Sequence, residues 1–364
     1  MGTCAGKEDR GPVGDLIDPT RKRFSVLEPD GAAGGGLLDL QPCILPLLGE
    51  SMQKLSVQGS SSTFGQKGFA DKRTVTEQFG GGEEVPLNFK VGWACKKGLK
   101  PESPNQDDFC VFCADGASIY GVFDGHGPCG HDVSNFVQTI ISRNFAQHPL
   151  FHDDPEKALS AAFLQTQNQC IKLQAEGQLD CSLSGTTATL AMQRDSVLYI
   201  AHVGDSRAVL ARMCDGHLEC EDLTNDHKPT CDGERRRIEA AGGEVRRLDG
   251  DIPHRVFLRG KMYPGLAMTR ALGDTVGTIA GVTSLPEVSA FKIKDNWQFM
   301  LLCSDGVWEF MTSHEAVELV HRFAVADVQK AAETLAAEAW TRWIQEEGNV
   351  VDDITVVCVW FRGD

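Results

Sequence analysis

The 364-residue sequence has no apolar run as long as the roughly 18–20 residues that a membrane-spanning helix needs. Basic residues are also scarce, because 35 Lys and Arg stand against 51 Asp and Glu, which gives a formal net charge of -16. Nucleic-acid binding needs clustered cations, so this balance argues against that class of protein. A phosphorylated ligand would be repelled as well, unless bound cations reversed the local field.

Several common motifs are missing. The small-residue turns at residues 184–187 and 204–207 are not followed by the Gly-Lys-Ser/Thr of a phosphate-binding P-loop. Cys110 and Cys113 form a C-x-x-C pair, but no second pair of cysteines or histidines completes a zinc site. The 13 cysteines are odd in number and irregularly spaced, and no secretory leader is recognisable. We therefore expect free thiols and a cytoplasmic protein.

The composition changes along the chain. Residues 1–87 are rich in Gly, Ser and charge and show little periodicity, so they are predicted to be a low-complexity, largely disordered extension. From residue 88 to 364 the pattern predicts one folded domain. β-Branched and aromatic runs predict strands at residues 89–95, 109–113, 119–123, 186–192, 197–203, 207–211, 288–293, 299–303 and 354–360.

Amphipathic helices are predicted at residues 131–146, 155–174, 233–241, 315–323 and 327–345. Asp154 is the expected N-cap of the second helix, and Thr312 with Glu315 forms a capping box before the fourth. Helices fall between groups of strands rather than after each strand, which favours antiparallel sheets with segregated helices. Residues 197–211, with Gly204 and Asp205 at the turn, are predicted to form a hairpin.

Four aspartates stand at the ends of predicted strands: Asp107, Asp124, Asp305 and Asp352. If these strands pair side by side, the four carboxylates converge on one rim. Carboxylates that lie so close repel one another unless a hard cation lies among them. Each motif taken alone also fits an ordinary turn or a solvated strand end. Together they predict a divalent-metal centre, and a centre without thiol or imidazole ligands favours phosphate chemistry.

Three further residues extend this hypothesis. Gly125 allows the backbone to approach a metal, and His126 then stands beside the site as a proton donor. Asp205 either joins the acidic cluster or is simply a turn residue.

Taken together, these segments resemble the metal-dependent type 2C protein Ser/Thr phosphatases, in the style of plant and protozoan members. The matching segments, in order, are PNQDDF, YGVFDGHGPCG, SGTTATL, LYIAHVGDSRAVL, LTNDHKP, GLAMTRALGD, LLCSDGVWEFM and DDITVVCV. The resemblance covers residues 89–362. It implies an α+β fold, a four-layer α-β-β-α sandwich of two antiparallel sheets flanked by helix pairs, with two Mg²⁺ or Mn²⁺ ions at one end.

The resemblance also implies residue roles. The metal ligands would be Asp107 (through metal-bound water), Asp124, Gly125, Asp305 and Asp352, with Asp205 and Glu309 at a weaker third ion. Asp124 would bridge both ions, and His126 would be the general acid. Residues 229–264 match the flap beside the cleft. Two positions depart from the family pattern: Gln106 stands where Glu is frequent, and Lys100 replaces an upstream Arg as the candidate for gripping the substrate phosphate.

The implied activity is metal-dependent hydrolysis of phosphoserine and phosphothreonine in phosphoprotein substrates, by direct attack of a metal-bridging water. One alternative is a pseudophosphatase, an interaction module with a weakened site, although all four ligand aspartates are present. Another is a hydrolase or nuclease acting on a different phosphate ester, although the acidic charge argues against nucleic acid.

The first residues, Met1-Gly2-Thr3-Cys4, suggest myristoylation at Gly2 and palmitoylation at Cys4. Two acyl chains would anchor the protein to the cytoplasmic face of a membrane, whereas one chain binds only reversibly. The alternative is an unmodified tail. We expect a monomer.

Overall fold

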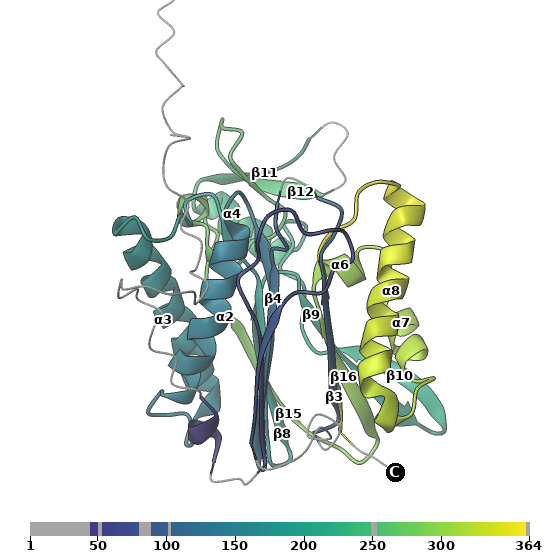
Figure 1. Ribbon diagram of the computed structural model, residues 1–364. Helices are drawn as coiled ribbons and strands as arrows, with labels where there is room; N and C mark the ends of the chain where they lie inside the picture. The colour runs from purple at the N-terminus through teal and green to yellow at the C-terminus, as the bar shows by residue number, and fades with distance from the viewer. Residues whose placement is uncertain (1–43, 50–52, 80–88, 101–102, 249–252, 362–364) are drawn as a thin grey trace, which may run out of the picture.

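Two antiparallel sheets packed face to face, with helices on both outer surfaces, make up the protein (Figure 1). The structure is a computed structural model and describes residues 44–49, 53–79, 89–100, 103–248 and 253–361. The predicted α+β class and the α-β-β-α layering are therefore confirmed. Within the described residues, no helix has the length and apolarity needed to cross a lipid bilayer.

The larger sheet contains, in spatial order, β15 (Glu287–Lys292), β8 (Val197–Val203), β7 (Ala188–Arg194), β5 (Ala117–His126), β4 (Asp107–Ala114), β1 (Lys54–Gly59) and β2 (Thr74–Phe79). Two short strands extend it beside β5: β6 (Gly185–Thr186) and β14 (Leu272–Gly273). The smaller sheet has the order β10 (His217–Asp222), β9 (Arg207–Cys214), β16 (Trp297–Cys303), β17 (Ile354–Trp360) and β3 (Val91–Lys96).

The helices form the outer layers. On the larger sheet lie α2 (Gly130–Ala146) and α3 (Pro155–Ala175), and on the smaller sheet lie α6 (Asp305–Trp308), α7 (Ser313–Val320) and α8 (Val328–Glu347). At one end, α4 (Asp232–Ala240) and α5 (Thr275–Ile279) accompany a three-stranded sheet of β11 (Gly243–Arg247), β12 (His254–Leu258) and β13 (Pro264–Leu266). Two 3₁₀ turns are η1 (Leu45–Leu48) and η2 (Val325–Asp327).

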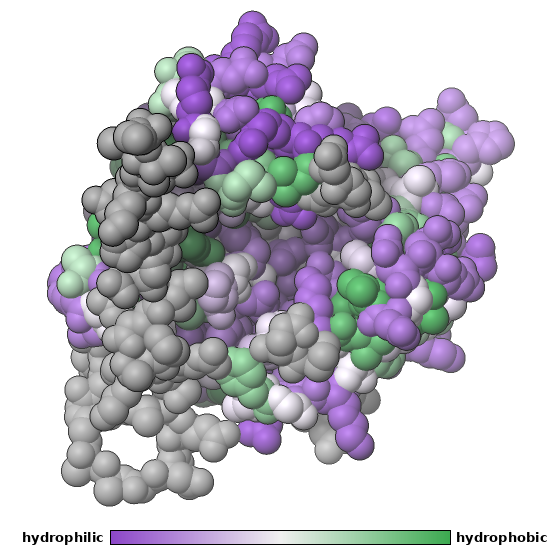
Figure 2. Space-filling model, turned by 90° about the horizontal axis from the view of Figure 1, so that it is seen from above, coloured by the Kyte–Doolittle hydropathy of each residue, from purple (hydrophilic) through white to green (hydrophobic). Residues whose placement is uncertain are grey.

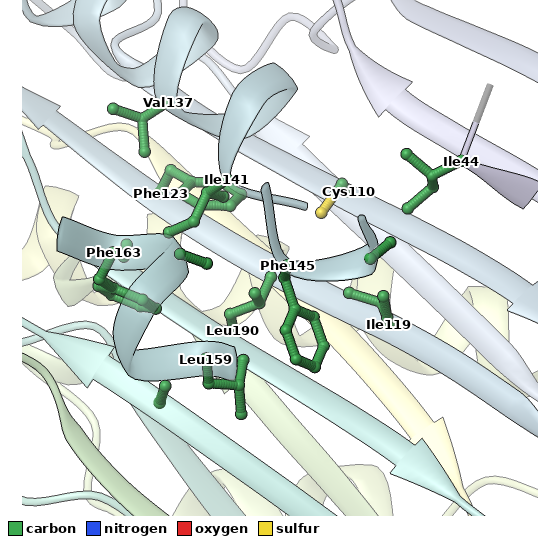
Figure 3. Packing of buried hydrophobic residues seen from close by; sticks show 14 of the residues in the cluster. Ile44, Cys110, Ile119, Phe123, Val137, Ile141, Phe145, Leu159, Phe163 and Leu190 are labelled. Carbon is green, nitrogen blue, oxygen red and sulfur yellow. The ribbon is translucent and has the colours of Figure 1, made fainter. Parts of the chain in front are cut away.

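Strand β4 shows how the layers share one core. All eight of its residues are buried, because one face meets the smaller sheet and the other meets the helices. Phe109 and Val111 lie in the cluster between the sheets, whereas Cys110 lies in the cluster beneath the helices with Phe145 and Ile141 of α2 (Figure 3). Strand residues alternate between faces. A strand that is buried on both faces therefore has a nearly continuous run of apolar residues in its sequence.

Most predicted elements are confirmed within a few residues, and residues 197–203 and 354–360 coincide with β8 and β17. Both predicted caps are present. Asp154 accepts a hydrogen bond from the Lys157 amide, and Thr312 and Glu315 form a capping box.

The predicted hairpin at residues 197–211 is wrong. Strand β8 pairs with β7 and β15 in the larger sheet, and β9 pairs with β10 and β16 in the smaller one. At Gly204, where φ is 96°, the chain instead crosses from one sheet to the other. The crossing lets Ile200 of β8 and Leu210 of β9 face the same inter-sheet core, which pairing within one sheet would not achieve.

The predicted disorder of residues 1–87 is wrong for residues 53–79. Strand β1 pairs with β4, and its Leu55 and Val57 are buried between the sheets. Strand β2 pairs with β1 at the sheet edge. The folded domain therefore begins well before residue 88. Residues 1–43 lie outside the described residues, so the prediction for them stands as a prediction.

Lys72, just before β2, ties this N-terminal hairpin to the rest of the domain. Its Nζ lies 3.2 Å from Asp108 Oδ2 and donates a hydrogen bond of 2.6 Å to the Asp107 carbonyl. The Lys72 and Asp108 side chains are 1% and 0% exposed. Asn135 of α2 donates to the same Asp108 oxygen at 2.9 Å. A buried, fully partnered ion pair thus joins the hairpin, β4 and α2.

We expect Lys72→Met to lower the free energy of unfolding by about 3–5 kcal/mol, because it leaves the Asp108 carboxylate buried and uncompensated. Lys72→Met combined with Asp108→Asn should recover much of this loss. Lys157→Met, which removes a solvent-exposed partner of Asp154, serves as the control and should have a far smaller effect. Urea denaturation measures all three. A Lys72→Met variant as stable as the control would contradict the assignment.

Candidate metal centre

The antiparallel pairing brings the four predicted aspartates to one end of the sandwich. Asp107 begins β4 and is the register partner of Asp124 near the end of β5. Asp305 follows the end of β16, and Asp352 precedes the start of β17, its antiparallel neighbour. Figure 2 looks onto this end, where hydrophilic residues dominate and surround a hollow. The structure therefore brings the four aspartates together, as the sequence predicted.

The carboxylates act strongly on one another. Burial raises the pKa of Asp124 well above its ordinary value, and the charges of Asp305, Asp107 and Asp352 raise it further. Burial, followed by the charges of Asp352 and Asp205, raises the pKa of Asp305 to about 7. The pKa of Asp107 is raised by burial and then by Asp353. Without a cation, this cluster holds its negative charge only at a considerable cost.

The oxygen atoms of this cluster fit divalent cations. Oδ2 of Asp107 accepts hydrogen bonds of 2.7 Å from Ser304 Oγ and from Thr355 Oγ1, whereas its Oδ1 is buried without a hydrogen-bond partner among the described residues. Oδ1 of Asp205 is also buried and lacks a partner within the same ranges. Buried acceptors without donors, surrounded by like charges, are what hard cations such as Mg²⁺ and Mn²⁺ bind.

Gly125 occupies a position that no larger residue could take. A Cβ atom there would lie 2.4 Å from the Gly130 carbonyl oxygen and 2.5 Å from that of Gln106. The Gly125 amide donates to the same Gln106 oxygen at 3.1 Å. The side chain of Gln106, at the position where Glu is frequent in the family, donates to the Gly127 carbonyl at 2.7 Å. Gln106 thus holds the turn that carries Gly125 and His126.

His126 is paired with Asp274, a residue that the sequence interpretation missed. Nε2 of His126 lies 2.6 Å from Asp274 Oδ2. Burial opposes a charge on the imidazole, but the Asp274 carboxylate outweighs this effect and raises the pKa of His126. Asp274 is fully buried and has φ of 43°, a left-handed backbone conformation that is uncommon outside glycine. The only sequence signal was its place at the end of the segment GLAMTRALGD.

Gly185 makes room for this pair. A Cβ atom at Gly185 would lie 2.1 Å from Asp274 Oδ2 and 2.8 Å from His126 Nε2. The turn at residues 184–187, which has no P-loop sequence, therefore supports the histidine–aspartate contact.

Two lysines pair with carboxylates of the cluster. Lys100 contacts Asp352, so the residue predicted to grip substrate phosphate is engaged with a candidate metal ligand. Lys228, which the sequence interpretation missed, contacts Asp205. Asp353 was missed as well. It accepts hydrogen bonds from the amides of Gly98 at 2.6 Å and Gln106 at 2.7 Å, and so holds the loop that leads to Asp107.

Among the described residues, Glu309 makes no side-chain hydrogen bond or ion pair with the aspartates of the cluster. Its side chain is exposed and lines a surface hollow of about 500 Å³ together with Arg207, Trp308, Phe310, Met311, Thr312 and Ser313. It is not among the charges that raise the pKa of Asp124 or Asp305. Glu309 is the C-cap residue of α6. The prediction that Asp205 and Glu309 hold a weaker third ion therefore stays a prediction.

The predicted flap, residues 229–264, corresponds to α4, β11 and β12 at the metal-centre end (Figure 1). Glu234 of α4 fixes it to the body of the protein. Its Oε1 lies 2.8 Å from Arg270 and 2.5 Å from Arg237, and Thr269 Oγ1 donates 2.5 Å to its Oε2. Burial opposes ionisation of Glu234, but these donors lower its pKa well below the ordinary value.

A second group of metal-binding residue types, His202, His227 and Glu287, lies below the flap. The Gly204 amide donates to Nδ1 of His227 at 3.1 Å, so the neutral ring carries its proton on Nε2, the nitrogen that faces Glu287. A protonated nitrogen offers no lone pair to a metal. We regard this group as structural.

Residues 104–347 match the family model described as Protein phosphatase 2C. The chain is 34% identical over 290 residues to "Probable protein phosphatase 2C 35" of Arabidopsis thaliana, covering 72% of this chain and 81% of the relative. It is 38% identical over 249 residues to "Probable protein phosphatase 2C 61" of the same plant, covering 66% and 75%. The similarity to these relatives covers most of the chain and is not limited to the eight matching segments.

Among solved structures, the fold is similar to serine-threonine phosphatase 2C from Toxoplasma gondii, with a TM-score of 0.66 and 22% identity over 75% of this chain and 94% of that chain. A C. elegans sex determining protein gives a TM-score of 0.62 and 24% identity over 75% of this chain and 65% of that one. At these identities the comparison supports the fold alone.

The pKa of Asp305, raised to about 7, predicts a pH-dependent stability of the metal-free protein. Because the folded state binds more protons than the unfolded state, the free energy of unfolding should fall as pH rises from about 4 to about 7. His126, whose pKa is also raised, acts in the same direction. In EDTA we expect a higher Tm at about pH 5 than at about pH 8, and Mg²⁺ or Mn²⁺ should restore the loss. Equal Tm values in EDTA would contradict the proposed repulsion.

Proposed function

Since the chain belongs to the protein phosphatase 2C family and is therefore a metal-dependent protein Ser/Thr phosphatase, we propose that water attacks the phosphoryl group of its phosphoprotein substrates directly, with His126 as the general acid. No covalent phosphoenzyme is involved in this proposal. The single observation that supports it most is the convergence of buried carboxylates from both sheets beside the His126–Asp274 pair.

We propose two Mg²⁺ or Mn²⁺ ions, which Asp124, the Gly125 carbonyl, Asp305 and Asp352 would hold, with Asp107 as a supporting acceptor beside them. When bound, such ions lower the pKa of water and neutralise phosphoryl oxygens. Asp205 and Glu309 are the proposed residues for a weaker third ion.

The protein's own contribution to the chemistry is the placement of a proton. Nε2–H of His126 donates to Asp274, which fixes the orientation of the ring. Nδ1 is then the ring nitrogen that protonates the departing serine or threonine oxygen. Burial opposes a charge on the imidazole, but Asp274 raises its pKa and so favours the protonated form that a general acid requires.

Lys100 is proposed to contact the substrate phosphate. It is 32% exposed at the rim and is the nearest cation to Asp352, although Asp352 competes for its charge. A pseudophosphatase would be expected to lack ligand aspartates, and every one of them is present here. No observation favours that alternative.

The N-terminal proposals stand on sequence alone. Gly2 and Cys4 lie outside the described residues, so their acylation and the resulting attachment to the cytoplasmic face of a membrane remain proposals. A cytoplasmic location and a monomeric state are likewise proposed.

The proposal predicts turnover of p-nitrophenyl phosphate and of a phosphothreonine peptide that depends on Mg²⁺ or Mn²⁺ and is abolished by EDTA. Asp305→Asn should lower kcat/KM at least about 100-fold on both substrates, because it removes a metal-binding charge. The matched control is Asp215→Asn, an exposed aspartate in the turn between β9 and β10, at the opposite end of β9 from Asp205. Wild-type protein that is inert toward both esters with either cation would refute the proposed function.

The general-acid role predicts an effect that depends on the leaving group. His126→Ala should slow a phosphoserine peptide by about 100-fold or more, since the alkoxide needs a proton. It should slow p-nitrophenyl phosphate much less, because that phenolate leaves unprotonated. Asp274→Asn should reproduce this selective loss in milder form. Equal losses on the two substrates would remove the assignment of His126.

A further inference from the structure

Residues 60–73, which we call the strap, connect β1 to β2 and precede the segment that matches the family model. The strap runs across the metal-centre end, from the larger sheet to the smaller one (Figure 1). There it pairs with the end of β3. The Phe69 amide donates to the Lys97 carbonyl at 2.6 Å, and the Lys97 amide donates to the Ala70 carbonyl at 2.9 Å.

The tip of the strap, residues 63–68, is flanked by contacts on both sides. On one side the ring of Phe64 packs edge-on against His131, with 5.8 Å between centroids. His131 follows Gly130, whose carbonyl closes around Gly125. On the other side Gly68 packs so tightly on Leu99 that a Cβ would lie 2.4 Å from its Cδ2. Leu99 precedes Lys100, the partner of Asp352. The tip therefore borders the centre from Gly125 to Lys100.

The strap is anchored next to this tip. The ring of Phe69 packs edge-on against Trp340 of α8, with 5.0 Å between centroids, and Lys96 lies over the other side of the same ring at 5.0 Å. Lys72 closes the strap with its buried pair to Asp108. Because these anchors restrict the loop before any ligand binds, a contact made by the tip costs little ordering entropy.

The tip exposes three side chains, those of Thr63, Phe64 and Lys67, and the last two supply apolar surface and charge. Phe64 is 49% exposed, and Lys67 is exposed and forms no ion pair with any residue in the described ranges. The flap stands on a different side of the centre, since its anchors Thr269 and Arg270 adjoin the chain that leads to Asp274. A peptide whose phosphorylated residue reaches the centre would thus pass the strap as well as the flap.

We propose that Phe64 and Lys67 are specificity-determining residues that contact the phosphoprotein substrate, selecting an apolar residue and an acidic residue close to the phosphorylated one. The inference rests on the proposed phosphatase function. In a chain with a net charge of -16, an exposed cation that forms no ion pair within the described part of the chain favours acidic segments of a substrate. Phe64 supplies the apolar contact area.

The test compares three substrates: p-nitrophenyl phosphate, a phosphothreonine peptide flanked by aspartates, and the same peptide flanked by lysines. Wild type should prefer the acidic peptide. Lys67→Glu should lower kcat/KM on the acidic peptide about tenfold and raise it on the basic one, since the charge contact is reversed. Phe64→Ala should lower kcat/KM on a peptide with a flanking Leu relative to one with Ser. Turnover of p-nitrophenyl phosphate should not change, because this ester is too small to reach the tip.

The matched controls are Lys294→Glu and Phe79→Ala. Both residues are exposed, and both lie at the opposite end of the strands. If Lys67→Glu changes the peptide preference no more than Lys294→Glu does, the strap does not select substrates and the inference is overturned. Equal losses on all three substrates would overturn it too. An inert wild type refutes the phosphatase function itself, which is a different result from an active enzyme that ignores the strap.

Discussion

Mutual repulsion among buried carboxylates is the constraint on which this structure depends. Asp124 and Asp305 come from different sheets, and burial raises the pKa of both. The charge of Asp305 raises the pKa of Asp124 further, and the charges of Asp352 and Asp205 do the same for Asp305. Each charge is removed from water and lies beside others of the same sign, which costs free energy. A bound divalent cation offsets this cost. The sandwich tolerates the cluster because its three apolar layers hold the strand ends in place independently of the site.

Because the apolar layers position the strand ends and the aspartates only occupy them, part of the site could be predicted from the sequence. Asp107, Asp124, Asp305 and Asp352 adjoin long apolar strands, and antiparallel pairing alone brings such strand ends together. Their convergence was therefore predictable once the strands were recognised. The fold class followed from the same grouping of strands and helices. Residues 197–203 and 354–360 were placed correctly because each is a short apolar run with sharp polar boundaries.

The errors arose where tertiary contacts decide the outcome. Strands β8 and β9 look like a hairpin locally, but both bury more apolar surface by facing each other across the two sheets. Strand β1 lies between glycine-rich stretches and is only six residues long, so its pairing with β4 left no periodic signal. Asp274 touches His126 across 148 positions of sequence. No local pattern carries such information.

Four lysines at the metal-centre end form ion pairs of two kinds, buried and partly exposed. The two kinds together explain how so acidic a centre can exist before it binds cations. Lys72 and Lys97 are nearly inaccessible and pair with Asp108 and Asp353, which support the loop and strand around Asp107 rather than line the centre. Buried pairs of this kind are costly to break, so they fix the frame.

Lys100 and Lys228 are about one third exposed, at 32% and 33%, and they contact Asp352 and Asp205 in the cluster itself. Asp205 is only 1% exposed, but Asp352 is 26% exposed, and an ion pair that solvent reaches on both sides contributes little net stability. Such a pair offsets part of the repulsion in the metal-free chain, yet it yields readily to a divalent cation, which carries twice the charge. The same residue type thus builds a permanent frame where it is buried and an exchangeable counter-charge where it is not.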